Sequence, residues 1–170
     1  MAVISFTADD GRPDQLESDA IVRVRRILGS ERQQHNANTK IVWSRDSYAK
    51  ETPAAFIGLL TSVEGVSKWL GELTMPEGSP VWFNRKLSEG PIRVTPSNMP
   101  PGAKSGLLIA GKLQYVANTA QEVQNVVKAK GGTALPVPGD SILELPANAW
   151  VRAKGWIAPY EVWDAESPQG

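Results

Sequence analysis

The chain of 170 residues contains no cysteine and only one histidine, His35. Without cysteine it can form neither disulfides nor thiolate metal sites, and a cysteine nucleophile is excluded. One histidine cannot build the usual zinc clusters by itself. A Ser-His-Asp triad would have to use His35, which lies in a polar stretch with no nucleophile-elbow motif nearby. The sequence therefore predicts no catalytic residue, no cofactor and no metal site.

The chain also lacks an excess of charge of either sign, since 18 Lys and Arg balance 18 Asp and Glu. It has no overall electrostatic attraction to nucleic acid or to an anionic membrane. No apolar run approaches the ~20 residues of a membrane span, and the N-terminal sequence lacks the basic start and apolar core of a signal peptide. We expect a soluble protein made in the cytoplasm, with neither nucleic acid nor membrane as a partner.

Most of the sequence consists of short alternating or apolar stretches that are separated by turn residues. Alternation with a period of two is typical of a strand with one buried face, and 15 Gly and 13 Pro supply frequent turns. Candidate strands lie at residues 3–7, 40–44, 81–83, 91–94, 106–116, 141–145, 149–154 and 160–163. Residues 29–39 and 45–51 are polar, which is typical of loops. The spacing predicts a mainly β fold, a β-sandwich or barrel-like antiparallel sheets, with one to three short helices.

Residues 14–28 fit two structures. A cap-like start and apolar residues on one helical face favour a helix, whereas residues 21–25 alternate as a strand would. Arg23, Arg25 and Arg26 form a basic cluster here. We interpret this cluster either as a solvated face or as a contact with an acidic partner surface.

Three threonines are typical of helix starts. Thr52 precedes a proline, and Thr61 and Thr119 each begin a Thr-x-x-Glu capping box. The Val-rich sequences after the two boxes could equally be strand edges. Because the stretches that follow the two boxes look alike, we interpret them as a candidate internal duplication, set against a chance match. The Pro-rich loop 95–105 would lie between the two halves.

Six tryptophans are many for a chain of this size. Trp82, Trp150, Trp156 and Trp163 lie on or beside predicted strands. Such rings fill a core or a subunit interface, which we favour, or stack on sugars when exposed. Trp150 shares its strand face with Arg152, so that face suits a packed interface covered by aliphatic stems. The candidate interface residues are Arg23, Arg25, Arg26, Trp82, Trp150, Arg152, Trp156 and Trp163.

The ending PVPGDSILELPANAWVRAKGWIAPYEVWDAES has the strand candidate GDSILEL after a proline-rich turn, then a W-V-R-A strand and a short final strand, YEVW. It resembles the closing strands of small β-rich structural proteins of tailed-phage virions, such as head decoration proteins and fibre bases. The resemblance covers about 35 residues and does not extend to residues 1–60. It implies a role in capsid or tail structure as a symmetric homo-oligomer, and it carries over no catalytic residues.

Two functions follow as expectations. The first is a capsid decoration protein on the phage head, a homo-oligomer, with a trimer favoured, that binds other capsid proteins. Residues 61–170 would form the β-sandwich-like domain, and residues 1–60 an N-terminal arm with a possible helix. The alternative is a carbohydrate-binding β-sandwich module, which requires at least two of the four tryptophans to be exposed and coplanar.

Overall fold

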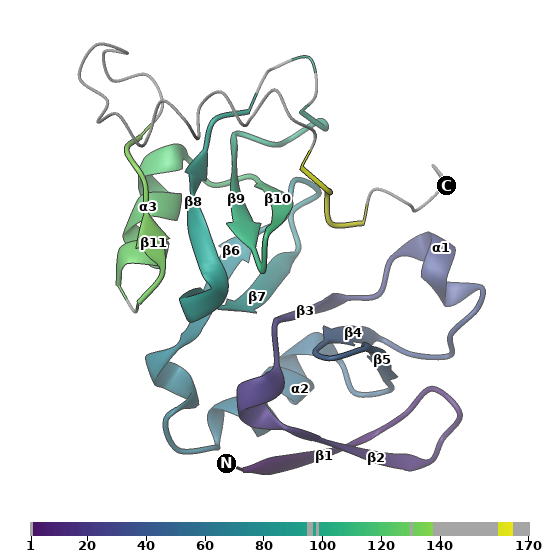
Figure 1. Ribbon diagram of the computed structural model, residues 1–170. Coiled ribbons are helices and arrows are strands. Elements are labelled where there is room, and N and C mark those ends of the chain that lie inside the picture. The colour runs from purple at the N-terminus through teal and green to yellow at the C-terminus, as the bar shows by residue number, and fades with distance from the viewer. Residues whose placement is uncertain (1, 95–96, 98, 130, 138–159, 165–170) are drawn as a thin grey trace.

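A computed structural model describes residues 2–94, 97, 99–129, 131–137 and 160–164. The described chain is mainly β, with three sheets and three short helices, as the sequence predicts (Figure 1). The elements in the first part are β1 (Val3–Thr7), β2 (Pro13–Glu17), β3 (Arg23–Arg26), α1 (Gly29–Arg32), β4 (Thr39–Val42), β5 (Asp46–Ala49) and α2 (Pro53–Thr61). Those in the second part are β6 (Leu70–Thr74), β7 (Pro80–Asn84), β8 (Ser88–Ile92), β9 (Ser105–Ile109), β10 (Lys112–Val116), α3 (Ala120–Lys128) and β11 (Thr133–Ala134). Short 3-10 turns lie at Ser18–Ala20, Val66–Lys68 and Arg85–Leu87.

Three sheets hold the fold together. The largest has the order β5-β4-β3-β7-β6 and is antiparallel throughout. A second sheet has the order β10-β9-β8-β11, in which only β11 runs parallel to its neighbour. β1 and β2 form a separate antiparallel hairpin. In Figure 1 the first-part strands and α2 lie in the lower half, and β8 to β10 with α3 lie in the upper half.

The two parts repeat one arrangement of elements. Each contains a hairpin, a 3-10 turn, a three-stranded antiparallel meander and a helix, in that order. We call them repeat 1 (β1 to α2) and repeat 2 (β6 to α3). The two helices begin after Thr52 and Thr119, 67 residues apart, and each threonine side chain caps its helix. The chain therefore folds as a tandem pair of similar β units.

Hydrogen bonds recur in the two repeats at a spacing of 66 or 67 positions. The amide of Thr7 donates to the Glu51 carboxylate, and 67 positions later the amide of Thr74 donates to the Asn118 side chain. The Thr39 hydroxyl donates to the carbonyl of Glu51, as the Ser105 hydroxyl does to the carbonyl of Asn118. Tertiary contacts, rather than element order alone, are thus shared by the repeats.

The repeats join by adding a strand to a sheet edge. β7, from the hairpin of repeat 2, pairs with β3 of repeat 1 through Val81, Trp82 and Phe83. The equivalent strand of repeat 1, β2, pairs only with β1 in the described part of the chain. Because strands from both sides of residue 60 share one sheet, residues 1–60 are not an arm outside a domain that starts at residue 61.

Each repeat has its own apolar core. In repeat 1, α2 buries Phe56 and Leu60 completely, and Phe56 meets Phe6 edge to face at 6.0 Å. In repeat 2, α3 buries Val123 and Val127 at the equivalent positions. Burial of these side chains removes apolar area from water, at about 25 cal/mol per Å², and so fixes each helix against its meander.

Several local predictions were wrong. The helix favoured for residues 14–28 does not form, because they belong to β2, a 3-10 turn and β3, which pairs on both sides within a sheet. The strand alternative at residues 21–25 overlaps β3. Residues 45–51 contain the edge strand β5, and residues 106–116 contain two strands, not one. Thr61 ends α2 instead of opening a helix, so the duplication pairs Thr119 with Thr52 and not with Thr61. The predicted strands at 141–145 and 149–154 lie outside the described residues.

Candidate functional site

Two arginines of β3 are completely buried between the repeats. Arg23 and Arg25 each have no exposed side-chain surface. Side chains alternate across a strand, so Val24 between them enters the apolar core of repeat 1 while the arginines lie on the opposite face. A buried guanidinium is costly unless it is paired and hydrogen-bonded. The site is therefore defined by the groups that pair with these two cations.

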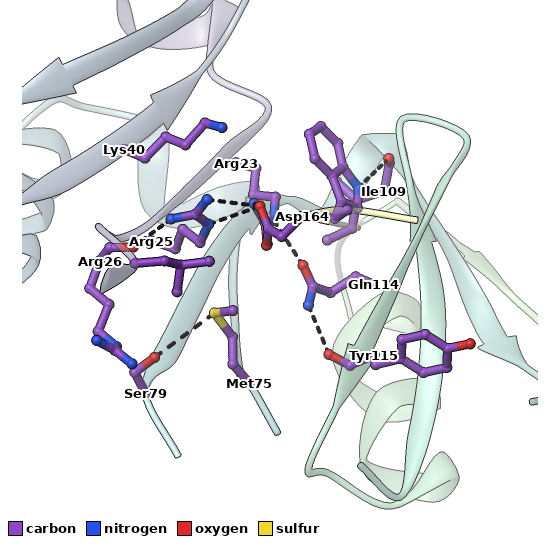
Figure 2. A network of polar contacts seen from close by, with 12 residues as sticks. Arg23, Arg25, Arg26, Lys40, Met75, Ser79, Ile109, Gln114, Tyr115 and Asp164 are labelled. Carbon is purple, nitrogen blue, oxygen red and sulfur yellow. Dashed lines mark hydrogen bonds and ion pairs between the residues drawn. The ribbon is translucent and has the colours of Figure 1, made fainter. Parts of the chain in front are cut away.

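Asp164, from the far end of the chain, pairs with both arginines (Figure 2). Its Oδ2 lies 2.6 Å from Nη2 of Arg23, and its Oδ1 lies 2.8 Å from Nη2 and 3.1 Å from Nε of Arg25. The Asp164 backbone has φ +66°, a left-handed conformation that aspartate tolerates better than most residues. One carboxylate thus bridges two buried cations from 139 and 141 positions away.

Two further side chains complete the pairing. Glu31, the third residue of α1, accepts from Nη1 and Nη2 of Arg25 at 2.8 and 2.7 Å. Gln114 of β10 accepts from Nε of Arg23 at 2.8 Å and donates to the backbone carbonyl of Tyr115. The network therefore ties β3 of repeat 1 to β10 of repeat 2 and to residue 164.

The pKa values follow from burial and pairing. Burial by itself would raise the pKa of Asp164, but the charges of Arg23 and Arg25 lower it to about 2. Burial would lower the pKa of Arg25, yet the Glu31 and Asp164 carboxylates raise it above its usual value. Burial lowers the pKa of Arg23, and Asp164 opposes that shift. Arginine keeps its proton in proteins, and a carboxyl with a pKa of about 2 is deprotonated at neutral pH. Asp164 and the two arginines are therefore all ionised at pH 7.

Residues 160–164, which we call the tail segment, dock on the outer edge of β10. The amide of Leu113 donates to the carbonyl of Glu161 at 2.8 Å, and the amide of Trp163 donates to the carbonyl of Leu113 at 2.9 Å. Val162 forms a parallel bridge with Leu113. The tail segment thus adds to the second sheet at one bridge, where a strand had been predicted at residues 160–163.

Trp163 lies between two cations. The Arg23 guanidinium is 4.9 Å and the Lys112 ammonium 4.3 Å from its ring centroid. Its indole N–H donates to the carbonyl of Ile109 at 3.1 Å. Cation–π pairs of this kind stabilise by about 0.5–2 kcal/mol each. Tyr160 and Val162 also pack against the apolar cluster of Ile92, Leu108 and Leu113. Ionic, aromatic and apolar contacts therefore hold the tail segment together.

The predicted interface residues fall into different environments. Arg23, Arg25 and Trp163 come together at the tail segment, so the view of the arginines as a solvated face was wrong for Arg23 and Arg25. Arg26 is part-exposed and pairs with Glu77 at 2.9 Å. Trp82 is 8% exposed and belongs to the core of repeat 1, so it is not free to stack on a sugar. Trp150, Arg152 and Trp156 lie outside the described residues.

The sequence reasoning missed the acidic half of the site. Neither Glu31 nor Asp164 carries a local pattern that marks it as a partner of buried arginines. His35 lies elsewhere, with Nδ1 2.6 Å from Oδ2 of Asp9 and its ring stacked on Tyr48 at 3.6 Å. Within the described ranges, no three His, Asp or Glu side chains gather as metal ligands.

Comparison of the chain with protein-family models, curated proteins and solved structures finds no match. Among the described residues, no helix is both long enough and apolar enough to cross a bilayer.

Proposed function

We propose that this protein is a structural component of a tailed-phage virion, a decoration protein that binds the head and other capsid proteins as a homo-oligomer, with a trimer favoured. The likeness of its C-terminal sequence to phage virion proteins supports the virion role. The assembly role is supported by one observation, namely that parts of this chain are joined by strand pairing at sheet edges.

Those pieces are joined at sheet edges. β7 adds to β3 between the repeats, and the tail segment adds to β10. Main-chain hydrogen bonds at a strand edge recognise any extended segment of suitable register, which is how proteins extend sheets between chains. β2 presents a further edge with no strand beside it in the described residues.

The buried charges also suit a structural role. Arg23 and Arg25 donate their side-chain hydrogen bonds to Asp164, Glu31, Gln114 and the backbone carbonyl of Arg26. A paired, buried network of this kind fixes one arrangement of the elements that it links. In a particle, it would hold the surface of each copy in a single form.

The test is a mass measurement with and without particles. Light scattering on the purified protein should give a trimer, and co-sedimentation should recover it with expanded phage heads. A chain that stays monomeric over the accessible concentrations and does not sediment with heads would contradict the proposal. Heads already carrying a bound decoration layer are the control for nonspecific sedimentation.

A further inference from the structure

We infer that the outer edge of β2 binds an extended basic segment of a neighbouring capsid protein, which adds to the hairpin of repeat 1 as an antiparallel strand. This inference rests on the proposed function for the source of the segment. It deepens that function, because it names the binding surface and the chemistry of the partner. The hairpin of β1 and β2 lies at the lower end of the molecule in Figure 1.

β2 is the counterpart of β7. Each is the second strand of its hairpin, and the two registers match, since Val3 faces Glu17 as Leu70 faces Asn84, 67 positions later. The other edge of β7 pairs with β3, whereas the other edge of β2 has no strand beside it in the described part of the chain. The joint between the repeats therefore shows what this edge accepts, namely an antiparallel strand.

The main-chain groups that such pairing requires face outward on β2. The amide of Ser18 and the carbonyl of Arg12, which flank β2, both bond to residues 2–8 on the β1 side. Main-chain bonds alternate between the two edges of a strand, so Gln15 and Glu17, both exposed, direct their N–H and C=O groups to the outer edge. Glu17 has the position of Asn84, whose amide donates to the carbonyl just before β3.

Two features of this edge do not close it. Pro13 has no N–H to donate, yet Pro80 at the equivalent position does not prevent β7 from pairing with β3. The Gln15 N–H is held by the Asp14 carboxylate at 2.8 Å. That bond is local and exposed, and a carbonyl of an incoming strand replaces it at little cost.

The charges around β2 favour a basic segment. Residues 9–19 contain five carboxylates and one arginine. In the joint between the repeats Arg25 faces Val81, and the counterpart of Val81 in β2 is Asp14. A strand with the pattern of β3 would thus place an arginine opposite a carboxylate, and opposite charges across a pair of strands stabilise it. The acidic hairpin of a second copy would be repelled from the same edge.

A labelled peptide with the sequence of residues 21–27, IVRVRRI, tests the edge, because β3 fits the equivalent edge of β7. Fluorescence anisotropy with the full-length protein should show saturable binding. A control peptide with glutamate in place of the three arginines should bind several-fold more weakly. Gln15→Pro removes an outward N–H and no bond to β1, and it should weaken binding about tenfold.

Glu17→Lys reverses a charge on the edge without changing a main-chain group, and it should weaken binding several-fold even if Gln15→Pro does not fold. Glu64→Lys is the matched control, since it makes the same charge change on an exposed turn outside the hairpin. It should bind the peptide as the natural chain does. Equal binding of the two peptides, or undiminished binding by Glu17→Lys, would overturn the inference. A mass that falls on Gln15→Pro substitution would also overturn it, because the edge would then join two copies.

Co-sedimentation with expanded heads separates this inference from the proposed function. Glu17→Lys should lower the head-bound fraction several-fold relative to Glu64→Lys, and the oligomer should keep its mass. If Glu17→Lys binds heads as well as the natural chain, the edge inference is wrong and the proposed function stands. If the natural chain binds the peptide but neither forms an oligomer nor binds heads, the proposed function is wrong and the β2 edge remains a site for basic strands.

Discussion

Replacing Asp164 by asparagine removes one charge from the most buried ion cluster and changes little else. Asparagine has the same shape and also accepts the left-handed backbone that residue 164 adopts. The exposed fraction of the Asp164 side chain is 12%, and those of Arg23 and Arg25 are 0%. Solvent therefore screens this interaction little, and the loss should be measurable.

Two estimates give the size of the loss in unfolding free energy for Asp164→Asn. A pKa lowered from 3.8 to about 2 corresponds to about 2 kcal/mol of stabilisation at neutral pH. Removing one partner of a buried ion pair typically costs about 3–5 kcal/mol, although undocking of the tail segment would relieve part of that loss. We expect Asp164→Asn to lower the free energy of unfolding by about 2–4 kcal/mol at pH 7.

The pH dependence has a definite sign. Because the pKa of Asp164 is lower in the folded protein, its stabilisation is complete above about pH 4 and is lost as the pH falls towards 2. The natural chain should lose this contribution over that range, and Asp164→Asn should not. Urea unfolding followed by tryptophan fluorescence at several pH values measures both effects.

Glu161→Gln is the matched control, since it removes an exposed carboxylate from the same tail segment. It should change the unfolding free energy by less than about 0.5 kcal/mol. An unchanged urea midpoint for Asp164→Asn, or an equal loss in Glu161→Gln, would refute the reasoning about buried pairing.

Three further predictions test the repeats. Thr52→Ala and Thr119→Ala should each cost about 1 kcal/mol in urea unfolding because each removes a helix cap, and serine at either position should restore most of it. Phe56→Ala should cost about 3–5 kcal/mol, since the ring is fully buried, whereas a loss below 1 kcal/mol would mean that the core is not packed as described. Gly102→Ala should lower the melting temperature, because the glycine has φ +87° and a Cβ there would overlap the carbonyl oxygen of Pro76; an unchanged melting temperature would count against that turn.

The sequence was sufficient for the fold class and for strands whose pattern is local. Residues 3–7 and 81–83 alternate or are apolar, and both lie in strands, β1 and β7. Thr52 before a proline correctly marked the start of α2. Each of these features depends on neighbours within a few residues, and such patterns can be read directly from a sequence.

The arginine site could not be predicted, for a physical reason. A strand with arginine at alternate positions looks like a strand with one solvated face, and only partners distant in sequence reverse that interpretation. Asp164 lies 139 positions from Arg25, and nothing near either residue indicates the other. The hairpin of β9 and β10 was missed because its turn, Ala110-Gly111, has both residues at positive φ, with alanine where asparagine or glycine is usual.

β11 limits how many repeats can be joined by strand pairing in this fold. In repeat 1 the outer edge of the meander, β3, accepts the hairpin of the following repeat. In repeat 2 the matching edge of β8 is filled by Thr133 and Ala134 of the same chain, and the Leu135 amide donates to the carbonyl of Gly90. β11 therefore occupies the edge of β8 that a further hairpin would need. The strand pairing that joins repeat 2 to repeat 1 cannot continue at β8 from one copy to the next, so the size of any assembly depends on other surfaces.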